Sequence, residues 1–333
     1  MRIPRSSGVL IACLALALSA QSAARQRTQP TEAELRERAY RAREELERLR
    51  AAGTPAELVP DYFAATVGPV PSSLGVDPFY RKYVDANGIP VLSSEKVPDA
   101  ALLVMRDIVN AMLAARSDLR ASMIERHWRT GVIAEVEMTA DIPEYANRKR
   151  PGAPEGEPVN QLDRDYHARR SRGLGGNPTT GAEENLLGYP GTRYYGEHIF
   201  VHEFSHAIMS AVRRVDPAMH AEIVAAYDAA KAAGKYVGVN GREHYALTSA
   251  SEYWAEGAQW WFFSNYGECF AGNVRVESPE DLQAYDPVLF ELLGRVFETH
   301  HIPMDIYHGR KVRPVRCGAA SIQPTRSPAS AAR

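Results

Sequence analysis

The chain has 333 residues and a formal net charge of −2, with 24% charged and 45% hydrophobic residues. These values are typical of soluble globular proteins, and they exclude a mostly disordered chain, a collagen-like fibre and a multi-span membrane protein. A sequence pI near 6.6 gives no basic footprint, so we expect no nucleic-acid binding. The length allows one large domain or two ordinary ones, each with a sizeable core.

Residues 1–24 have the pattern of a secretory signal peptide. Two arginines precede an apolar run over residues 9–20, and Ser22 and Ala24 fit the small-residue positions before a cleavage site. The run is shorter than the roughly 20 residues needed to cross a bilayer, so we expect no membrane span. We therefore expect a secreted or periplasmic protein after cleavage near Ala24. A lipoprotein box ending at Cys13 is the weaker alternative, because the apolar run continues past it.

Cleavage would remove one of the three cysteines and leave Cys269 and Cys317 in an oxidising compartment. Two cysteines in such a compartment predict one disulfide, with two free thiols as the alternative.

The mature chain divides into a charged helical segment over 25–59, a main domain over 60–309 and a disordered basic tail over 310–333. In the first of these, Thr31 and Glu34 fit a capping box. Leucine and alanine residues follow at helical spacing. The resulting apolar stripe is expected to pack on the main domain, and a partner-binding helix is the alternative.

Helical periodicity dominates the main domain. Residues 54–98 are punctuated by proline and glycine, and residues 146–196 have so little periodicity that we expect a long loop. One short strand is expected over 132–136. Helices are expected over 99–113, 119–128, 195–215, 217–233, 248–263 and 287–299. The sequence therefore predicts an α+β fold that is dominated by helices and has a small sheet in its first half.

A metal-binding pattern lies on the helix expected over 195–215. His202 and His206 are four residues apart, so both imidazoles project from one helical face and can reach the same metal ion. Glu203 lies beside that ion, where it can take a proton from a bound water. The pattern predicts one zinc ion per chain, although ordinary helices also carry it by chance.

A hydrolytic zinc site needs a third protein ligand and a free position for water. Glu252 and Glu256 are four residues apart on the helix expected over 248–263, among tryptophan, tyrosine and phenylalanine residues. An unpaired carboxylate is costly in such a setting. We therefore expect Glu252 to bind zinc and Glu256 to accept the outer N–H of a ligating histidine. Three histidines are weaker candidates for the third ligand: His198, His220 and His244.

The segments HEFSH (202–206) and EYWAE (252–256) together resemble the gluzincin metallopeptidases, and within them the catalytic domain of anthrax lethal factor and its bacterial relatives. The resemblance implies a zincin-like catalytic domain over 60–309, with the metal motif on its active-site helix. It also implies that Tyr245, seven residues before Glu252, assists the transition state. Seven residues are about two helical turns, which would direct the side chains of Tyr245 and Glu252 towards one cavity. The alternative is that Tyr245 is a packed aromatic residue.

Three further stretches look like a family of uncharacterised secreted proteins with the same metal motif. They are MTADIPEY (138–145), RGLG (172–175) and EENLL (183–187). This likeness covers roughly residues 60–310. Ala182 stands where many relatives have cysteine, so a disulfide of that family is expected to be missing.

These residues predict an exported zinc metallopeptidase that hydrolyses peptide or protein substrates. Glu203 is expected to act as general base on the zinc-bound water. Tyr245 is expected to donate to the oxyanion, with His244 as a further candidate. The strand over 132–136 is expected to be the sheet edge to which an extended peptide adds. The arginine-rich residues 148–172 either bind acidic substrate groups or form a solvated loop.

Two other classes of function remain open. One is a zinc hydrolase of a non-peptide amide or ester, such as a cell-wall or glycan-linked bond. The other is a non-catalytic, zinc-stabilised binding protein or an inhibited precursor. Glu203 argues against the second class, because a structural zinc site needs no general base. The sequence predicts neither the oligomeric state nor the cleavage specificity.

Overall fold

The computed structural model describes residues 67–189, 192–297, 300 and 317. Three parts predicted from the sequence lie outside these residues: the signal peptide (1–24), the charged helical segment (25–59) and, apart from residue 317, the basic tail (310–333). The described residues combine helices with a small sheet, so the prediction of a helix-dominated α+β fold is confirmed.

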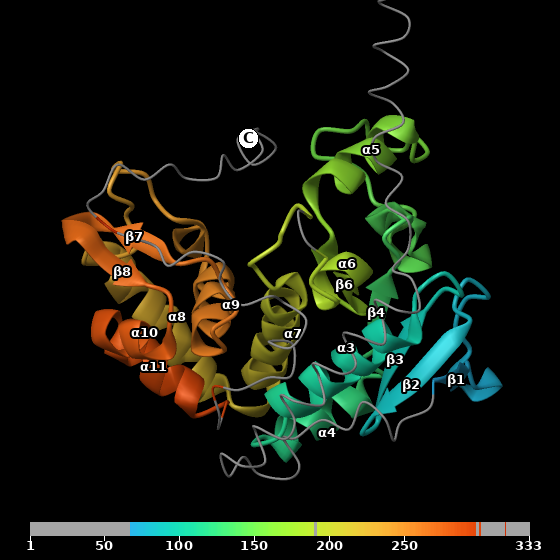
Figure 1. Cartoon of the computed structure of the whole chain (residues 1–333), viewed down its shortest axis with the longest axis horizontal. Helices are drawn as coiled ribbons and strands as arrows, with labels where there is room; N and C mark the ends of the chain where they lie inside the picture. Colours follow the sequence, from blue (N-terminus) through green and yellow to red (C-terminus); the bar gives the residue numbers. More distant parts are fainter. Residues whose placement is uncertain (1–66, 190–191, 298–299, 301–316, 318–333) are drawn as a thin grey trace, which may run out of the picture. The chain divides into compact units, whose positions relative to one another are not determined.

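Six strands form one sheet in the order β1-β2-β3-β4-β6-β5 (Figure 1). Their bounds are β1 Gly68–Pro69, β2 Lys82–Ala86, β3 Ile89–Ser93, β4 Thr130–Ile133, β5 Gly173–Leu174 and β6 Thr179–Ala182. Strands β3, β4 and β6 run parallel, and the remaining pairs are antiparallel. The turn between β2 and β3 is Asn87-Gly88, with φ angles of 52° and 91°. These left-handed conformations match the twist of a two-residue hairpin.

Strand β4 lies inside the sheet and begins two residues before the strand expected over 132–136. Gly131 is opposite Leu92 of β3 on one side and Thr180 of β6 on the other. The expectation that residues 132–136 form the edge for a substrate was therefore wrong. Strand β6 occupies that side, and it comes from a region that the sequence predicted as loop.

Helices are the commonest element of the described chain (Figure 1). Their bounds are α3 Asp99–Met112, α4 Ser117–Glu125, α5 Gln161–Arg170, α6 Glu183–Leu186, α7 Ile199–Val215, α8 Pro217–Ala232, α9 Ala250–Trp261, α10 Pro279–Tyr285 and α11 Pro287–Gly294. Short 3₁₀ helices are η2 Ser72–Leu74, η3 Thr139–Asp141, η4 Pro143–Tyr145, η5 Tyr245–Leu247 and η6 Ala271–Asn273. The six helices expected from the sequence are present with shifted ends. The sequence missed α10, and it missed α5 and α6 inside the expected loop.

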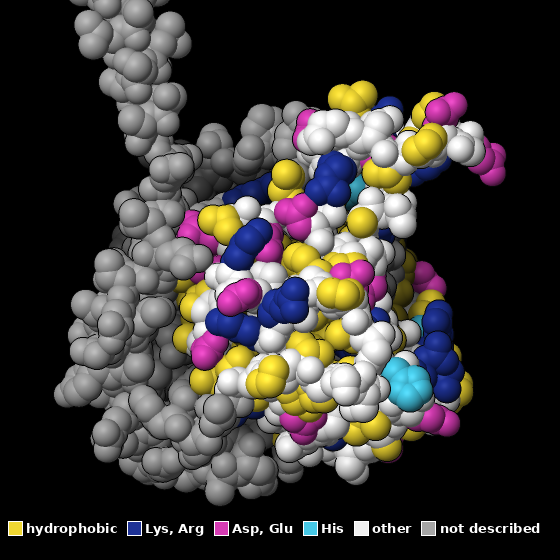
Figure 2. Space-filling model, turned by 90° about the vertical axis from the view of Figure 1, so that its right-hand side faces the viewer, with side chains coloured by type: hydrophobic (Ala, Val, Ile, Leu, Met, Phe, Trp, Pro, Cys, Tyr) yellow, Lys and Arg dark blue, Asp and Glu magenta, His cyan; other side chains and the backbone are white. Residues whose placement is uncertain are grey.

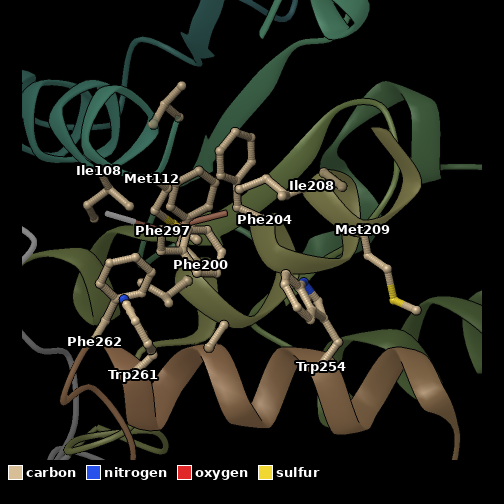
Figure 3. Packing of buried hydrophobic residues seen from close by; sticks show 14 of the residues in the cluster. Ile108, Met112, Phe200, Phe204, Ile208, Met209, Trp254, Trp261, Phe262 and Phe297 are labelled. Carbon is tan, nitrogen blue, oxygen red and sulfur yellow. The ribbon is translucent and has the colours of Figure 1, made fainter. Parts of the chain in front are cut away.

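The apolar core joins α3, α7 and α9 (Figure 3). Phe200 and Phe204 on α7 are fully buried, and their rings stack with centroids 5.5 Å apart. Replacing such a phenylalanine by alanine costs about 3–5 kcal/mol. Trp254 of α9 donates its indole N–H to the carbonyl of Ser205 at 3.2 Å. This packing fixes α9 against α7, and these two helices carry the side chains of the expected metal site.

A hairpin and a disulfide lie in the last part of the described chain. Strand β7 (Glu268–Phe270) pairs antiparallel with β8 (Val274–Val276). Cys269 of β7 forms a disulfide with Cys317, with their Cα atoms 5.5 Å apart. Residue 317 is thereby attached to the hairpin.

No described helix is both long and apolar enough to span a bilayer. On the face drawn in Figure 2, basic and acidic side chains lie interspersed with hydrophobic ones. This mixture agrees with the small net charge of the chain.

Candidate metal centre

The start of α7 is held by two side chains. His198 precedes the helix, and its Nδ1 accepts the N–H of Val201 at 3.3 Å. The side-chain oxygen of Asn185 accepts the N–H of Ile199 at 2.8 Å. Both bonds satisfy N–H groups that the first turn of a helix leaves without a partner. His198, a weaker ligand candidate in the sequence, therefore acts as a helix cap.

Three side chains bring metal-binding atoms together: His202 and His206 on α7 and Glu252 on α9. The two Nε2 atoms are 3.2 Å apart. Glu252 Oε2 lies 2.9 Å from Nε2 of His202 and 3.3 Å from that of His206. Among the described residues, this is the one group of His, Cys, Asp and Glu whose ligand atoms meet in this way. Two imidazole nitrogens and one carboxylate oxygen suit zinc and leave a position for water, so the residues present fit the ion.

The protonation states of His202 and Glu252 depend on one another. Burial lowers the pKa of His202, but the hydrogen bond to Glu252 and the nearby glutamate charges outweigh burial and raise that pKa to about 10. Burial raises the pKa of Glu252, but its contacts with His202 and His206 hold it well below the usual range. The carboxylate is therefore ionised and available as a ligand. A proton on His202 Nε2 uses the lone pair that a metal ion needs, so protons and metal compete for this nitrogen.

Two neutral side chains hold the outer nitrogens of the imidazoles. His206 Nδ1 lies 2.7 Å from Ser251 Oγ. His202 Nδ1 lies 3.2 Å from Gln259 Oε1, and Gln259 is fully buried. Partners of this kind set the orientation and the tautomer of a ligating histidine.

Glu256, which the sequence suggested as the partner of a ligating histidine, lies one step further out. Its Oε1 is 3.9 Å from His202 Nδ1, beyond hydrogen-bond distance. Its other oxygen accepts a hydrogen bond from Asn265 Nδ2 at 2.7 Å. Asn265 Nδ2 also lies 3.2 Å from Gln259 Oε1. Glu256 is thus linked to the imidazole through Asn265 and Gln259.

Glu203 is half-buried and lies next to the segment that follows β5. A Cβ atom added to Gly175 would lie 3.2 Å from Glu203 Oε2 and 3.6 Å from His206 Cβ. The main chain at Gly175 therefore passes directly beside the carboxylate and one of the candidate ligands.

Tyr245 lies at the start of η5, close to the same cluster. Its hydroxyl donates to Glu252 Oε1 at 3.2 Å, and its ring centroid is 6.2 Å from that of His202. The side chain is 47% exposed. Burial of the hydroxyl and the charge of Glu252 both raise the pKa of Tyr245, so the hydroxyl stays protonated as a hydrogen-bond donor.

His244 and His220 lie outside the cluster of ligand atoms. Nδ1 of His244 accepts the N–H of Ala246 at 3.2 Å, and its ring packs against Trp260 and Phe270. These contacts hold the turn that carries Tyr245, so His244 supports η5.

The arginine-rich region 148–172 makes ion pairs within the chain. Three pairs connect its side chains to carboxylates: Arg150 with Asp163, Arg164 with Asp141 and Arg172 with Glu184. These contacts favour a structural role for the region over the binding of acidic substrate groups.

The sequence did not indicate that Ser251 and Gln259 contact the two histidines, or that Gly175 lies beside Glu203. Gln259 lies seven residues after Glu252, about two helical turns, so this spacing indicates that both lie on one face of α9. Gly175 gave no comparable signal, because a residue without a side chain adds nothing to a hydrophobic pattern.

Neither a family model nor a curated protein matches this chain. Among solved structures it is similar to the PRO-PRO endopeptidase PPEP-2 from Paenibacillus alvei, with 16% identity and a TM-score of 0.38. The match covers 62% of this chain and 96% of that chain. A score at this level does not establish a shared fold. The function of this chain is therefore inferred from the side chains of its candidate metal centre.

Proposed function

We propose that this chain is an exported, zinc-dependent peptidase of the gluzincin type, similar to the lethal-factor group. The observation that carries the proposal is the meeting of ligand atoms from His202, His206 and Glu252, with Glu203 next to His202 on the same helix. The likeness of the two helical segments to gluzincins supports the same assignment, and the signal-like residues 1–24 support export.

Zinc held by these three side chains would supply Lewis-acid chemistry, polarising a carbonyl and making water more acidic. Glu203 takes the proton of the attacking water and later delivers it to the leaving amine. Tyr245 exchanges its hydrogen bond with Glu252 for one to the oxyanion that forms on the substrate. Ser251 and Gln259 hold the two imidazoles in place during these steps.

Strand β5 is the proposed template for the substrate. It lies at the end of the sheet, beyond β6. The N–H of Leu174 donates to Thr180 Oγ1 on β6, so by alternation the main-chain groups of Gly173 face the opposite side. An extended peptide can add to such an edge. A peptide bound there lies close to Glu203, whose Cγ is 3.6 Å from the Cβ position of Gly173.

The variant Glu203→Gln tests this proposal, because it keeps the size of the side chain and removes the base. We expect the purified mature protein to contain one zinc per chain and to cleave a denatured proteome, as followed by mass spectrometry. Glu203→Gln should keep its zinc and lose about 10³-fold in rate. Glu222→Gln, on the exposed surface of α8, is the matched control and should retain activity.

Equal cleavage by wild type and Glu203→Gln would contradict the proposed mechanism. Zinc binding by a wild type that cleaves no peptide would favour the other two classes, a hydrolase of non-peptide bonds or a zinc-stabilised binding protein.

A further inference from the structure

Arg172, which immediately precedes β5, is anchored by a network of partly buried hydrogen bonds. Its side chain is 14% exposed. Its guanidinium donates to both carboxylate oxygens of Glu184, at 2.6 and 2.9 Å. It also donates to the carbonyl of Ala134 at 2.9 Å and to that of Glu137. A bidentate pair with further carbonyl acceptors fixes both the position and the plane of an arginine.

The turn that follows β4 holds the same segment through two hydroxyl groups. Thr139 Oγ1 donates to the carbonyl of Ser171 at 2.8 Å. The Tyr145 hydroxyl donates to the carbonyl of Pro178. Thr139 and Tyr145 are both buried. The turn therefore contacts the segment on both sides of β5.

Asn177 fastens the far end of the segment. Its Oδ1 accepts the N–H of Arg129 at 2.9 Å, and its Nδ2 donates to the carbonyl of His127 at 3.1 Å. Both partners lie just before β4. The side chain of Asn177 is exposed. It therefore holds the main chain through these two hydrogen bonds and not through buried packing.

The side chains of Thr139, Tyr145, Arg172 and Glu184 come from the three sequence stretches that the metal chemistry leaves unused. Tyr145 ends the first (138–145), Arg172 begins the second (172–175), and Glu184 lies in the third (183–187). The stretch held between Arg172 and Asn177 contains Gly175, which lies beside Glu203. The three stretches thus act on one short piece of main chain next to the candidate general base.

We propose that Arg172 and Asn177 are positioning residues that hold residues 173–175 as a rigid edge, on which an extended peptide is aligned beside Glu203. This inference rests on the proposed peptidase function. A rigid edge lowers the entropy lost when a peptide pairs with it. Only a peptide that extends from the scissile bond along residues 173–175 pairs with this edge, so long peptides gain from it and short peptides that end near the scissile bond gain little.

The test compares Arg172→Lys and Asn177→Ala with Arg116→Lys. Arg172→Lys keeps the charge near Glu184 and loses the bidentate geometry, whereas Asn177→Ala changes an exposed side chain and leaves the buried ion pair intact. Arg116 is the matched control, because it makes a bidentate pair with Asp118 at 2.8 and 2.7 Å and its side chain is 18% exposed.

The substrates are a peptide of about eight residues, taken from a cleavage site found in the proteome digest, and its central four residues. For the longer peptide, both variants should raise KM about 10-fold with kcat little changed. Cleavage of the shorter peptide and zinc affinity should match the wild type, and Arg116→Lys should match it throughout. An equal loss on both peptides, or no loss on either, overturns the proposal.

Amide hydrogen exchange separates this inference from the peptidase assignment. Residues 171–178 of the zinc-loaded protein should exchange faster in both variants than in wild type and Arg116→Lys. Unchanged exchange rates would contradict the proposal that Arg172 and Asn177 hold this edge rigid, whether or not the protein cleaves peptides. A third outcome is faster exchange in both variants with no cleavage that depends on Glu203. It would overturn the peptidase function and the alignment of substrate, and the contacts of Arg172 and Asn177 would then have a structural role only.

Discussion

The side-chain amide of Gln259 determines which nitrogen of His202 carries a hydrogen. Its Nε2 donates to the carbonyl of His198 at 3.0 Å, and a carbonyl can only accept. Its Oε1, which accepts from Asn265, must therefore be the atom that faces His202 Nδ1. His202 therefore donates from Nδ1, and once a metal ion displaces the proton from Nε2, the lone pair of Nε2 binds that ion.

Replacing Gln259 with leucine should weaken zinc binding about 10- to 100-fold, because leucine has nearly the same size and cannot accept the Nδ1–H. Competition with a chromogenic chelator measures the dissociation constant. Gln161→Leu on α5, where the amide contacts Asp165, is the control and should bind zinc as the wild type does. An unchanged zinc affinity in Gln259→Leu would show that His202 needs no such partner.

Glycines let the sheet approach α7 without an intervening layer of side chains. A Cβ atom at Gly181 of β6 would lie 2.8 Å from the Cβ of Phe200. One at Gly173 of β5 would lie 2.6 Å from Ile199 Cγ2 and 2.8 Å from the carbonyl oxygen of Thr180. Strands β5 and β6 therefore rest directly on the first turns of the helix that carries the metal motif.

The change Gly181→Ala should lower the free energy of unfolding by about 1–3 kcal/mol, because the added methyl group overpacks the contact with Phe200. Gly131→Ala on the neighbouring strand β4 is the control. Its Cβ would meet Thr180 Cγ2 at 3.4 Å, an ordinary contact distance. Urea denaturation of both variants measures the difference, and equal stabilities would contradict the close approach.

The same glycines explain why the sheet was hard to predict. Strands β5 and β6 contain Gly173 and Gly181 and show little alternation of polar and apolar residues. The sequence pattern therefore predicts a loop for these residues and an edge position for β4. The hairpin between β2 and β3 was missed for another reason. Asn87-Gly88 between two short runs is a recognised hairpin signal, but the prolines and glycines around it obscured the strands.

The helices were easier to predict because their apolar faces repeat over several turns. Helix α7 presents Phe200, Phe204 and Ile208 to the core, and this periodicity places His202 and His206 on another face. The meeting of Glu252 with these histidines was expected from its spacing to Glu256 and its aromatic surroundings. Gln259 lies 3.2 Å from His202 Nδ1 and Glu256 lies 3.9 Å from it, and no sequence pattern specifies so small a difference.

At the scale of the whole described chain, the candidate ligands come from helices that are far apart in the sequence. Helix α7 is packed between the sheet on one side and α9 on the other. Trp254 of α9 bonds to Ser205 of α7, and Glu252 on the same helix reaches the histidines. A metal ion at this position would therefore add to the contacts that hold α9 against α7.

Removal of the metal should lower the melting temperature of the wild type. An ion that binds the folded state stabilises it by about 4 kcal/mol when its free concentration is 1,000 times its dissociation constant. Thermal unfolding with and without a chelator measures this effect. Glu252→Ala is the control, since it lacks one ligand and should respond little to the chelator. If the chelator leaves the melting temperature of the wild type unchanged, this would contradict a metal ion bound between α7 and α9.

The disulfide and the candidate metal centre both cross-link the second half of the chain. His202 and Glu252 are 50 residues apart, and Cys269 and Cys317 are 48 apart. The two intervals follow one another without overlap, so each tie closes a loop that the other leaves untouched. With zinc bound, this part of the protein would contain two successive cross-links of different chemistry. A chelator would open one and a reductant the other, and their contributions to stability would add.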